Sequence, residues 1–128
     1  MSMPNIKIAV IEDNLSIQQM YVTKLGLSGF DVKAADDGKA GLLLIAKYRP
    51  ELILLDIKMP EMSGDEMLQH LRATDYGWSV KVIILTNLSR DEAPRSLQIL
   101  NINRYVVKAH HTPQQIIGIV NDVLGITS

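Results

Sequence analysis

The chain contains no cysteine, which excludes a disulfide-stapled scaffold and any zinc or thiol site built on Cys. It also lacks a strong net charge, because thirteen Lys and Arg against fourteen Asp and Glu leave −1 at pH 7. No global field therefore draws the protein to nucleic acid or to an acidic bilayer, and we expect no direct contact with either.

Long apolar runs are missing as well. The longest are about five residues, against the roughly 20 that a membrane span needs. The start "MSMPNIKIAV" lacks the charged beginning and long apolar stretch of a signal peptide. Because the absence of Cys also fits a reducing compartment, we expect a cytoplasmic protein. Neither GxGxxG nor GxxxxGK[ST] occurs, which argues against dinucleotide binding and P-loop chemistry.

The pattern that is present predicts one α/β domain over residues 1–128. Helical patterning follows each of five short apolar or β-branched runs, at 6–11, 31–35, 52–56, 80–86 and 104–108. Strands that alternate with helices favour right-handed crossovers and a parallel sheet covered on both faces. The expected architecture is therefore (βα)5, a doubly wound five-stranded parallel sheet.

Several residues mark where the helices begin and end. The second helix should stop before Pro50, because the residue ahead of a proline disfavours the α region. Ser63 with Glu66 predicts a capping box at the third helix. Asn101, which tolerates the left-handed conformation, should close the fourth. Thr112 opens the last helix as its cap, with Gln115 as the reciprocal partner and Pro113 at the first helical position.

Pro94 lies where the first turns of the fourth helix should be. If that helix began at Arg90, the proline ring would clash with the carbonyl four residues back, at a cost of about 3 kcal/mol or more. We predict that the segment "SRDEA" (89–93) is irregular or a separate turn, with regular helix from about Pro94.

Polar residues follow the predicted strands where a doubly wound sheet forms its ligand site. Glu12 and Asp13 follow the first strand, Asp56 ends the third, Thr86 the fourth and Lys108 the fifth. Three converging acids repel one another unless a cation lies among them, and oxygen ligands suit Mg²⁺. Lys108 can pair with a carboxylate or a phosphoryl group, and Thr86 offers a hydroxyl donor. The set favours phosphoryl transfer to a carboxylate, with Asp56 as the nucleophile.

Taken singly, each of these residues has a plainer structural explanation. Glu12 and Asp13 could be acids favoured by the dipole at a helix N-terminus, and Thr86 an ordinary strand residue. Lys108 and Asp56 could be solvated strand ends. The functional interpretation rests on their joint occurrence. For His110 and His111 no partner ligand is evident, so we expect a solvated loop rather than a metal site.

Four segments, "IEDN", "LLDIKMPEMSG", "ILTN" and "YVVK", resemble in order the motifs of the receiver domain of two-component response regulators. The resemblance covers essentially the whole chain and implies the flavodoxin-like strand order 2-1-3-4-5. It implies a Mg²⁺ site in which Asp13 binds directly, Glu12 acts through water and the backbone carbonyl of Lys58 completes the set around Asp56.

The same resemblance assigns the remaining roles. Asp56 accepts the phosphoryl group, Thr86 is the switch hydroxyl and Lys108 the phosphate partner. Tyr105 takes the place of the aromatic that turns inward on phosphorylation. Pro60 and Gly64 match the loop after the acceptor.

The function implied is a stand-alone phosphorylation switch rather than a turnover enzyme, one that catalyses its own phosphorylation and dephosphorylation. The donor would be a histidine kinase or a histidine phosphotransfer protein. Because the sequence ends soon after the last helix, we expect output by protein contact through the surface of the fourth helix, fifth strand and fifth helix. The protein would be a monomer or a phosphorylation-dependent dimer.

Two other functions stay open at this stage. A phosphatase of the haloacid dehalogenase type also uses a strand-end Asp with Mg²⁺, but it normally carries a second acid two residues later, where this chain has Lys58. A pseudo-receiver would bind partners constitutively, yet such proteins usually lose the acceptor, the acids or the lysine, and all are present here.

Two departures from the family pattern give local predictions. By the resemblance, Leu88 and Lys58 occupy positions that flank the path of the hydrolytic water. An apolar Leu cannot orient that water and a long Lys can cover the acyl phosphate, so we predict slow self-dephosphorylation. Lys108 is followed by Ala109 where the family usually has proline. A non-proline cis bond costs roughly 2.5 to 4 kcal/mol, so we predict a trans Lys108–Ala109 peptide, a displaced loop, and Lys108 still reaching Asp56.

Overall fold

The computed structural model describes residues 5–126. Five parallel strands form one sheet in the order β2-β1-β3-β4-β5, which confirms the predicted topology. The strands are β1 (Lys7–Ile11), β2 (Asp31–Ala35), β3 (Leu52–Leu55), β4 (Lys81–Thr86) and β5 (Arg104–Val107). Because β1, β3 and β4 are buried on both faces, their sequences are almost continuously apolar.

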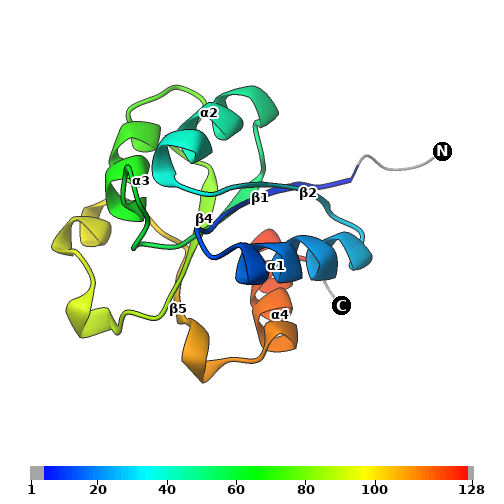
Figure 1. Cartoon of the computed structure of the whole chain (residues 1–128). Coiled ribbons are helices and arrows are strands. Elements are labelled where there is room, and N and C mark those ends of the chain that lie inside the picture. Colours follow the sequence, from blue (N-terminus) through cyan, green and yellow to red (C-terminus); the bar gives the residue numbers. More distant parts are fainter. Residues whose placement is uncertain (1–4, 127–128) are drawn as a thin grey trace.

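Within the described residues four α-helices cover the sheet: α1 (Leu15–Leu27), α2 (Gly38–Tyr48), α3 (Gly64–Arg72) and α4 (Pro113–Leu124). The pair α1 and α4 lies on one face, and α2 and α3 lie on the other (Figure 1). Along the strands, alternate residues pack into a hydrophobic core on one face of the sheet and into a second core on the other. Ile11, Leu55 and Ile84 pack toward α2 and α3, while Val10 and Leu54 pack toward α1 and α4.

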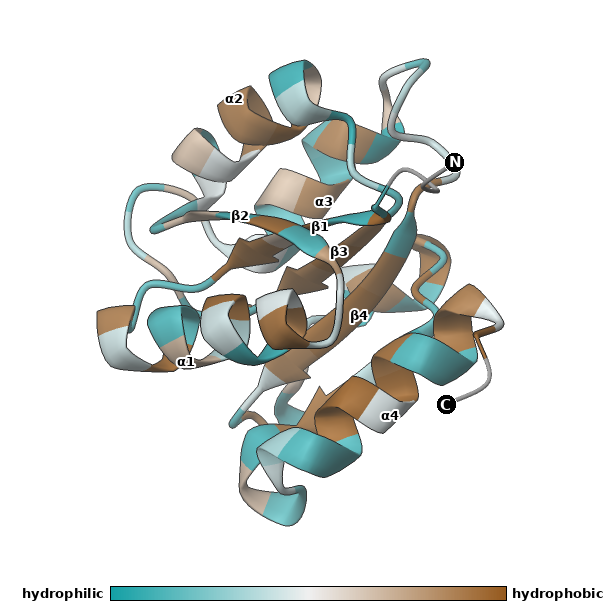
Figure 2. Ribbon diagram, turned by 90° about the vertical axis from the view of Figure 1, so that its right-hand side faces the viewer, coloured by the Kyte–Doolittle hydropathy of each residue, from teal (hydrophilic) through white to brown (hydrophobic). Residues whose placement is uncertain are grey.

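Hydropathy follows this layering. The central strands are mostly apolar, whereas the covering helices alternate apolar and polar residues along their length (Figure 2). Each helix thus buries one face and exposes the other. No helix within residues 5–126 combines the length and the hydropathy that crossing a membrane requires.

The predicted ends of α2 and α4 are confirmed. Helix α2 ends at Tyr48, ahead of Pro50, and Arg49 caps it in the left-handed conformation with φ 53°. At the start of α4 the Thr112 hydroxyl accepts a hydrogen bond from the Gln115 N–H at 3.2 Å, and the Gln115 side chain accepts one from the Thr112 N–H at 2.8 Å. This reciprocal pair is the predicted capping box.

The capping box predicted at α3 is wrong. The Ser63 hydroxyl donates instead to the Glu66 carboxylate at 2.9 Å, and no side chain caps the first N–H groups of the helix. The Gly64 N–H donates to the Ile57 carbonyl at 2.7 Å. The first N–H of α3 is therefore paired with the loop that follows β3, a tertiary contact that local sequence does not reveal.

The segment between β4 and β5 contains two 3₁₀ turns, η1 (Arg90–Glu92) and η2 (Arg95–Ile99). The separate turn predicted at 89–93 is confirmed, but the regular helix predicted from about Pro94 is wrong. Ala93 and Pro94 have ψ of 145° and 135°, outside the α region. For Ala93 the reason is that a residue before proline avoids the α region. The turn η2 ends at Ile99, and Asn101, two residues later, is left-handed as predicted with φ 59°.

Candidate functional site

The acids predicted to converge do so at the carboxyl edge of the sheet. Glu12 and Asp13 leave β1 and Asp56 leaves β3, and each offers one carboxylate oxygen within 4.8 Å of the others. Glu12 is 4% exposed and Asp56 8% exposed, while Asp13 faces solvent. Neighbouring parallel strands, paired through Ile11 and Leu55, end side by side and bring the three together.

Lys108 lies between two of these acids. Its Nζ donates to Asp56 Oδ2 at 3.1 Å and also to Glu12 Oε1. The peptide bonds of residues 5–126 include no cis bond, so the trans link to Ala109 and the reach of Lys108 to Asp56 are confirmed. Whether the loop departs from the family norm stays a prediction.

Burial and charge act on the ionisable groups in opposite directions. Burial raises the pKa of Glu12 above its ordinary value, although the hydrogen bond from Lys108 opposes that shift. Burial alone would lower the pKa of Lys108, but the hydrogen bond to Glu12 and the charge of Asp56 outweigh it, so that pKa is raised. The ammonium is therefore held in its charged form against the carboxylates.

Backbone contacts fix the Asp56 carboxylate. Its Oδ1 accepts a hydrogen bond from the Ile57 N–H at 2.7 Å, which leaves Oδ2 toward Lys108. The Asp56 N–H donates to the Ile11 carbonyl at 3.0 Å and continues the β1–β3 ladder. Gly64 lies so close that a Cβ there would stand 2.0 Å from the Asp56 carbonyl oxygen.

A cavity of about 320 Å³ opens beside Asp56, and its other lining residues are Lys58, Thr86, Asn87 and Leu88. Thr86 is 2% exposed, and its hydroxyl oxygen accepts a long hydrogen bond, 3.4 Å, from the Leu88 N–H. The cavity thus joins the predicted acceptor to the predicted switch hydroxyl, and it includes both side chains named for slow dephosphorylation.

The donor set fits Mg²⁺. The three clustered side chains, Glu12, Asp13 and Asp56, supply only oxygen atoms, which hard cations prefer. When all are ionised, the three carboxylates and the Lys108 ammonium leave two negative charges, which a divalent cation would balance. The cluster found among residues 5–126 contains neither His110 nor His111, and His111 Nδ1 lies 3.1 Å from the Val107 carbonyl instead.

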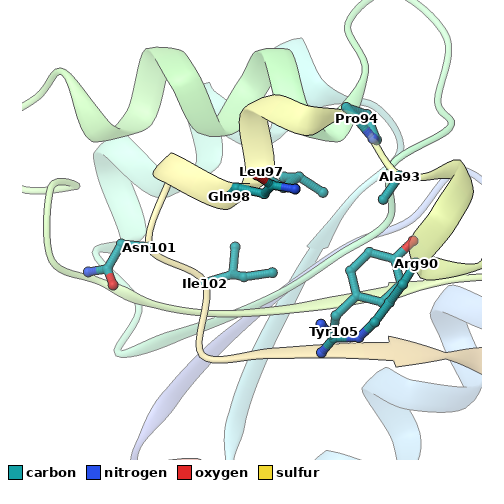
Figure 3. Close-up of a pocket in the computed structure, with 8 residues that line it drawn as sticks. All are labelled: Arg90, Ala93, Pro94, Leu97, Gln98, Asn101, Ile102 and Tyr105. Atoms are coloured by element: carbon teal, nitrogen blue, oxygen red, sulfur yellow. The ribbon is translucent and has the colours of Figure 1, made fainter.

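Tyr105 lies on β5, the outer strand of the sheet beside β4. Its hydroxyl donates to the Leu88 carbonyl at 2.8 Å and to the Ser89 carbonyl at 3.2 Å. The Arg90 guanidinium stands 5.4 Å from its ring centre. Figure 3 shows both side chains at one end of a pocket of about 400 Å³, which extends beneath η2 to Asn101.

Gln18 was not identified from the sequence. It is 3% exposed and donates hydrogen bonds at the ends of β1 and β2. The signal was available, because Gln18 stands three residues before Tyr21 and seven before Leu25 on the buried face of α1. A polar residue at that spacing must find buried partners.

Comparison with known proteins agrees with this geometry. The family model described as response regulator receiver domain matches residues 8–121. A probable transcriptional regulator ycf27 of Porphyridium aerugineum is 34% identical over 119 residues, which make up 92% of this chain and 48% of that protein. The chain thus spans about half the length of this relative.

Two solved structures show the same fold. The chemotaxis protein CheY4 of Vibrio cholerae superposes with a TM-score of 0.86 at 25% identity, covering 94% of this chain and 99% of that one. The receiver domain of the Francisella response regulator 1452 gives a TM-score of 0.81 at 31% identity, covering 93% and 96%.

Proposed function

Because the chain belongs to the response regulator receiver family, a family of phosphorylation-based signalling switches, we propose that Asp56 is its phosphoryl acceptor and that the donor is a phosphohistidine. The observation that carries this proposal is the position of Asp56. Its carboxylate is nearly buried, bonded to Lys108 and open to a 320 Å³ cavity that Thr86 also lines.

The proposed transfer breaks the P–N bond of the phosphohistidine and forms a P–O bond to the Asp56 carboxylate, while the bonding electron pair leaves with the imidazole. Mg²⁺ held by Asp13, Asp56 and the Lys58 carbonyl, and by Glu12 through water, would supply positive charge near the phosphoryl oxygens. Lys108, 3.1 Å from Asp56 Oδ2, is placed to donate to a phosphoryl oxygen once the acceptor oxygen is esterified.

The signal would leave through the strand that carries Tyr105. Thr86 can donate its hydroxyl to a phosphoryl oxygen, and a shift of Thr86 would move the following residues Leu88 and Ser89. Since the Tyr105 hydroxyl is bonded to both of their carbonyls, that shift would reach the face formed by η1, η2, β5 and α4. We propose that this face, with the pocket of Figure 3, contacts the downstream protein.

The test is to incubate the chain with acetyl phosphate and Mg²⁺ and to measure its mass. One added phosphoryl group is expected, with none for Asp56→Asn. A chain that gains no phosphoryl mass from acetyl phosphate or from a phosphorylated histidine kinase would contradict the proposal. Turnover of p-nitrophenyl phosphate that Asp56→Asn abolishes would indicate a phosphatase instead.

The proposed output has its own test. Beryllofluoride, which imitates a phosphoryl group on a carboxylate, should change amide hydrogen exchange at residues 87–105 as well as around Asp56. A change confined to the residues that touch Asp56 would contradict output through this face.

A further inference from the structure

Gln18 is a buried amide that bridges the ends of two strands. From the first turns of α1 its Nε2 donates to the Glu12 carbonyl at 3.0 Å and to the Ala35 carbonyl at 3.1 Å. It also donates to Asp36 Oδ1 at 2.8 Å, while its own Oε1 accepts from Gln19 at 3.1 Å. All its polar atoms are therefore paired in a site that is 3% exposed.

One of these bonds acts at the acidic pair itself. The Glu12 carbonyl belongs to the peptide that joins Glu12 to Asp13, so the Gln18 amide fixes the plane from which both side chains leave the backbone. On the other side, the Glu12 N–H donates to the Ala35 carbonyl at 3.1 Å. The turn after β1 is held to β2 through both contacts.

Asp13 depends on this backbone support. The side chains of Glu12 and Asp56 are held by Lys108, but among residues 5–126 no hydrogen bond or ion pair to the Asp13 carboxylate is found. Asp13 is also exposed. Its position relative to Asp56 is therefore set by its backbone, which Gln18 orients.

We propose that Gln18 is a positioning residue for Mg²⁺ binding: its amide orients the Glu12–Asp13 peptide so that the Asp13 carboxylate faces Asp56. This inference rests on the proposed function, which places the ion among these acids. Side chains that orient metal ligands through hydrogen bonds commonly govern affinity although they do not touch the ion.

The experiment measures Mg²⁺ affinity by titration calorimetry. Gln18→Met keeps the length of the side chain and removes both N–H bonds, which three acceptors share. We expect binding about tenfold weaker, the lower end of the loss seen for such outer residues. The matched control is Tyr48→Phe, which removes a partly buried side-chain donation, 2.8 Å, to the Asp31 carbonyl at the opposite end of β2. Its Mg²⁺ affinity should equal that of the unaltered chain.

A second variant covers the case in which Gln18→Met fails to fold. Gln18→Asn keeps an amide that is one methylene short of the Glu12 carbonyl, and we again expect weakened binding. Unaltered affinity in the folded Gln18 variants would overturn the inference alone, and so would an equal loss in Tyr48→Phe. Failure of the unaltered chain to bind Mg²⁺ would overturn the proposed function as well.

Discussion

Lys108 and Glu12 form an ion pair that is only slightly exposed, with side-chain exposures of 13% and 6%. Such a pair is costly to desolvate, and removing one partner leaves a buried charge uncompensated. Under the proposed function, this arrangement prepares the site for a phosphoryl group on Asp56. The ammonium already faces Asp56, so little reorganisation is required when charge arrives there.

Leu88 lies beside the proposed phosphoryl acceptor. It lines the cavity beside Asp56 with an apolar side chain that cannot orient an attacking water. We expect Leu88→Asn to shorten the lifetime of the phosphorylated protein roughly fivefold, as one hydrogen bond of about 1 kcal/mol to that water would give. The measurement is the decay of phosphoryl mass after the donor is removed. Leu43→Asn, at an exposed leucine of α2, is the control, and equal lifetimes in all three chains would count against the idea.

Gly64 gives a second prediction, based on its close approach to the acceptor. A Cβ at this position would lie 2.0 Å from the Asp56 carbonyl oxygen, so the backbone must shift. We expect Gly64→Ala to lower the free energy of unfolding by about 1 to 3 kcal/mol and to slow phosphorylation of Asp56. Gly118→Ala in α4 meets nothing within 4 Å and should stabilise by up to about 1 kcal/mol. Urea unfolding checks both values, and a neutral Gly64→Ala would refute the crowding.

At the scale of elements, strands were predicted more successfully than the segment between β4 and β5. Burial on both faces makes β1, β3 and β4 continuously apolar, so their sequences are unambiguous. For residues 94–101 the apolar positions Leu97 and Leu100 fit an α-helix, but the break at Ala93 and Pro94 leaves five residues for η2. A helix of five residues forms too few α-helical hydrogen bonds to offset the free-energy cost of its first turn.

The residues of the site also divide into two groups: those that the order of the strands predicts, and those that only tertiary contacts bring to the site. Glu12, Asp13, Asp56 and Lys108 could be predicted because strand ends in a doubly wound sheet must meet. Gln18 could not be assigned a role, because its partners lie on β1 and β2 and only the fold brings them together.

Arg72 connects two loops through its side chain. At the end of α3 its guanidinium donates to four backbone carbonyls, those of Gly77, Val80, Leu100 and Asn101, and so ties the loop after α3 to the end of η2. Burial lowers the pKa of this group. A lysine ammonium cannot face four carbonyls in two loops, so we expect Arg72→Lys to lower the free energy of unfolding by about 2 kcal/mol.

The control for Arg72 is another arginine on the same side of the molecule. Arg95→Lys changes an exposed side chain and should alter stability by no more than about 0.5 kcal/mol. Both variants are compared by urea unfolding. A loss in Arg95→Lys as large as that in Arg72→Lys would show that the four carbonyl contacts are not the cause.

The two opposite edges of the sheet carry different groups of residues in the whole molecule. Its carboxyl edge carries the acids, Lys108 and Thr86, while its opposite edge holds contacts that do not involve these residues. There Tyr48 donates to the Asp31 carbonyl at 2.8 Å, and Lys33 stands 5.0 Å from its ring centre. Variants at that edge can therefore report on global stability without touching the site.

Tyr48 gives the prediction for pH. Burial, then the hydrogen bond to Asp31, raises its pKa above the ordinary value of 10.0. The folded protein then keeps a proton that the unfolded chain releases above pH 10, so the free energy of unfolding should fall as pH rises through that region. Lys108, whose pKa is also raised, acts with the same sign in every variant that retains it.

We expect Tyr48→Phe to lose stability less steeply with pH above 10 than the unaltered chain, because it removes this titrating group. Urea unfolding at neutral pH and at several values above pH 10 measures the two slopes. Parallel curves would mean that Tyr48 does not contribute to the alkaline loss of stability.

The most direct measurement of the central claim is to locate the phosphoryl group on the chain. After reaction with acetyl phosphate and Mg²⁺, borohydride reduces an aspartyl phosphate to homoserine, which peptide mass mapping places in the sequence. We expect homoserine at position 56, and none when Mg²⁺ is chelated or when Asp56→Asn is used. Homoserine at Asp13 or at any other aspartate, with residue 56 unchanged, would contradict the account.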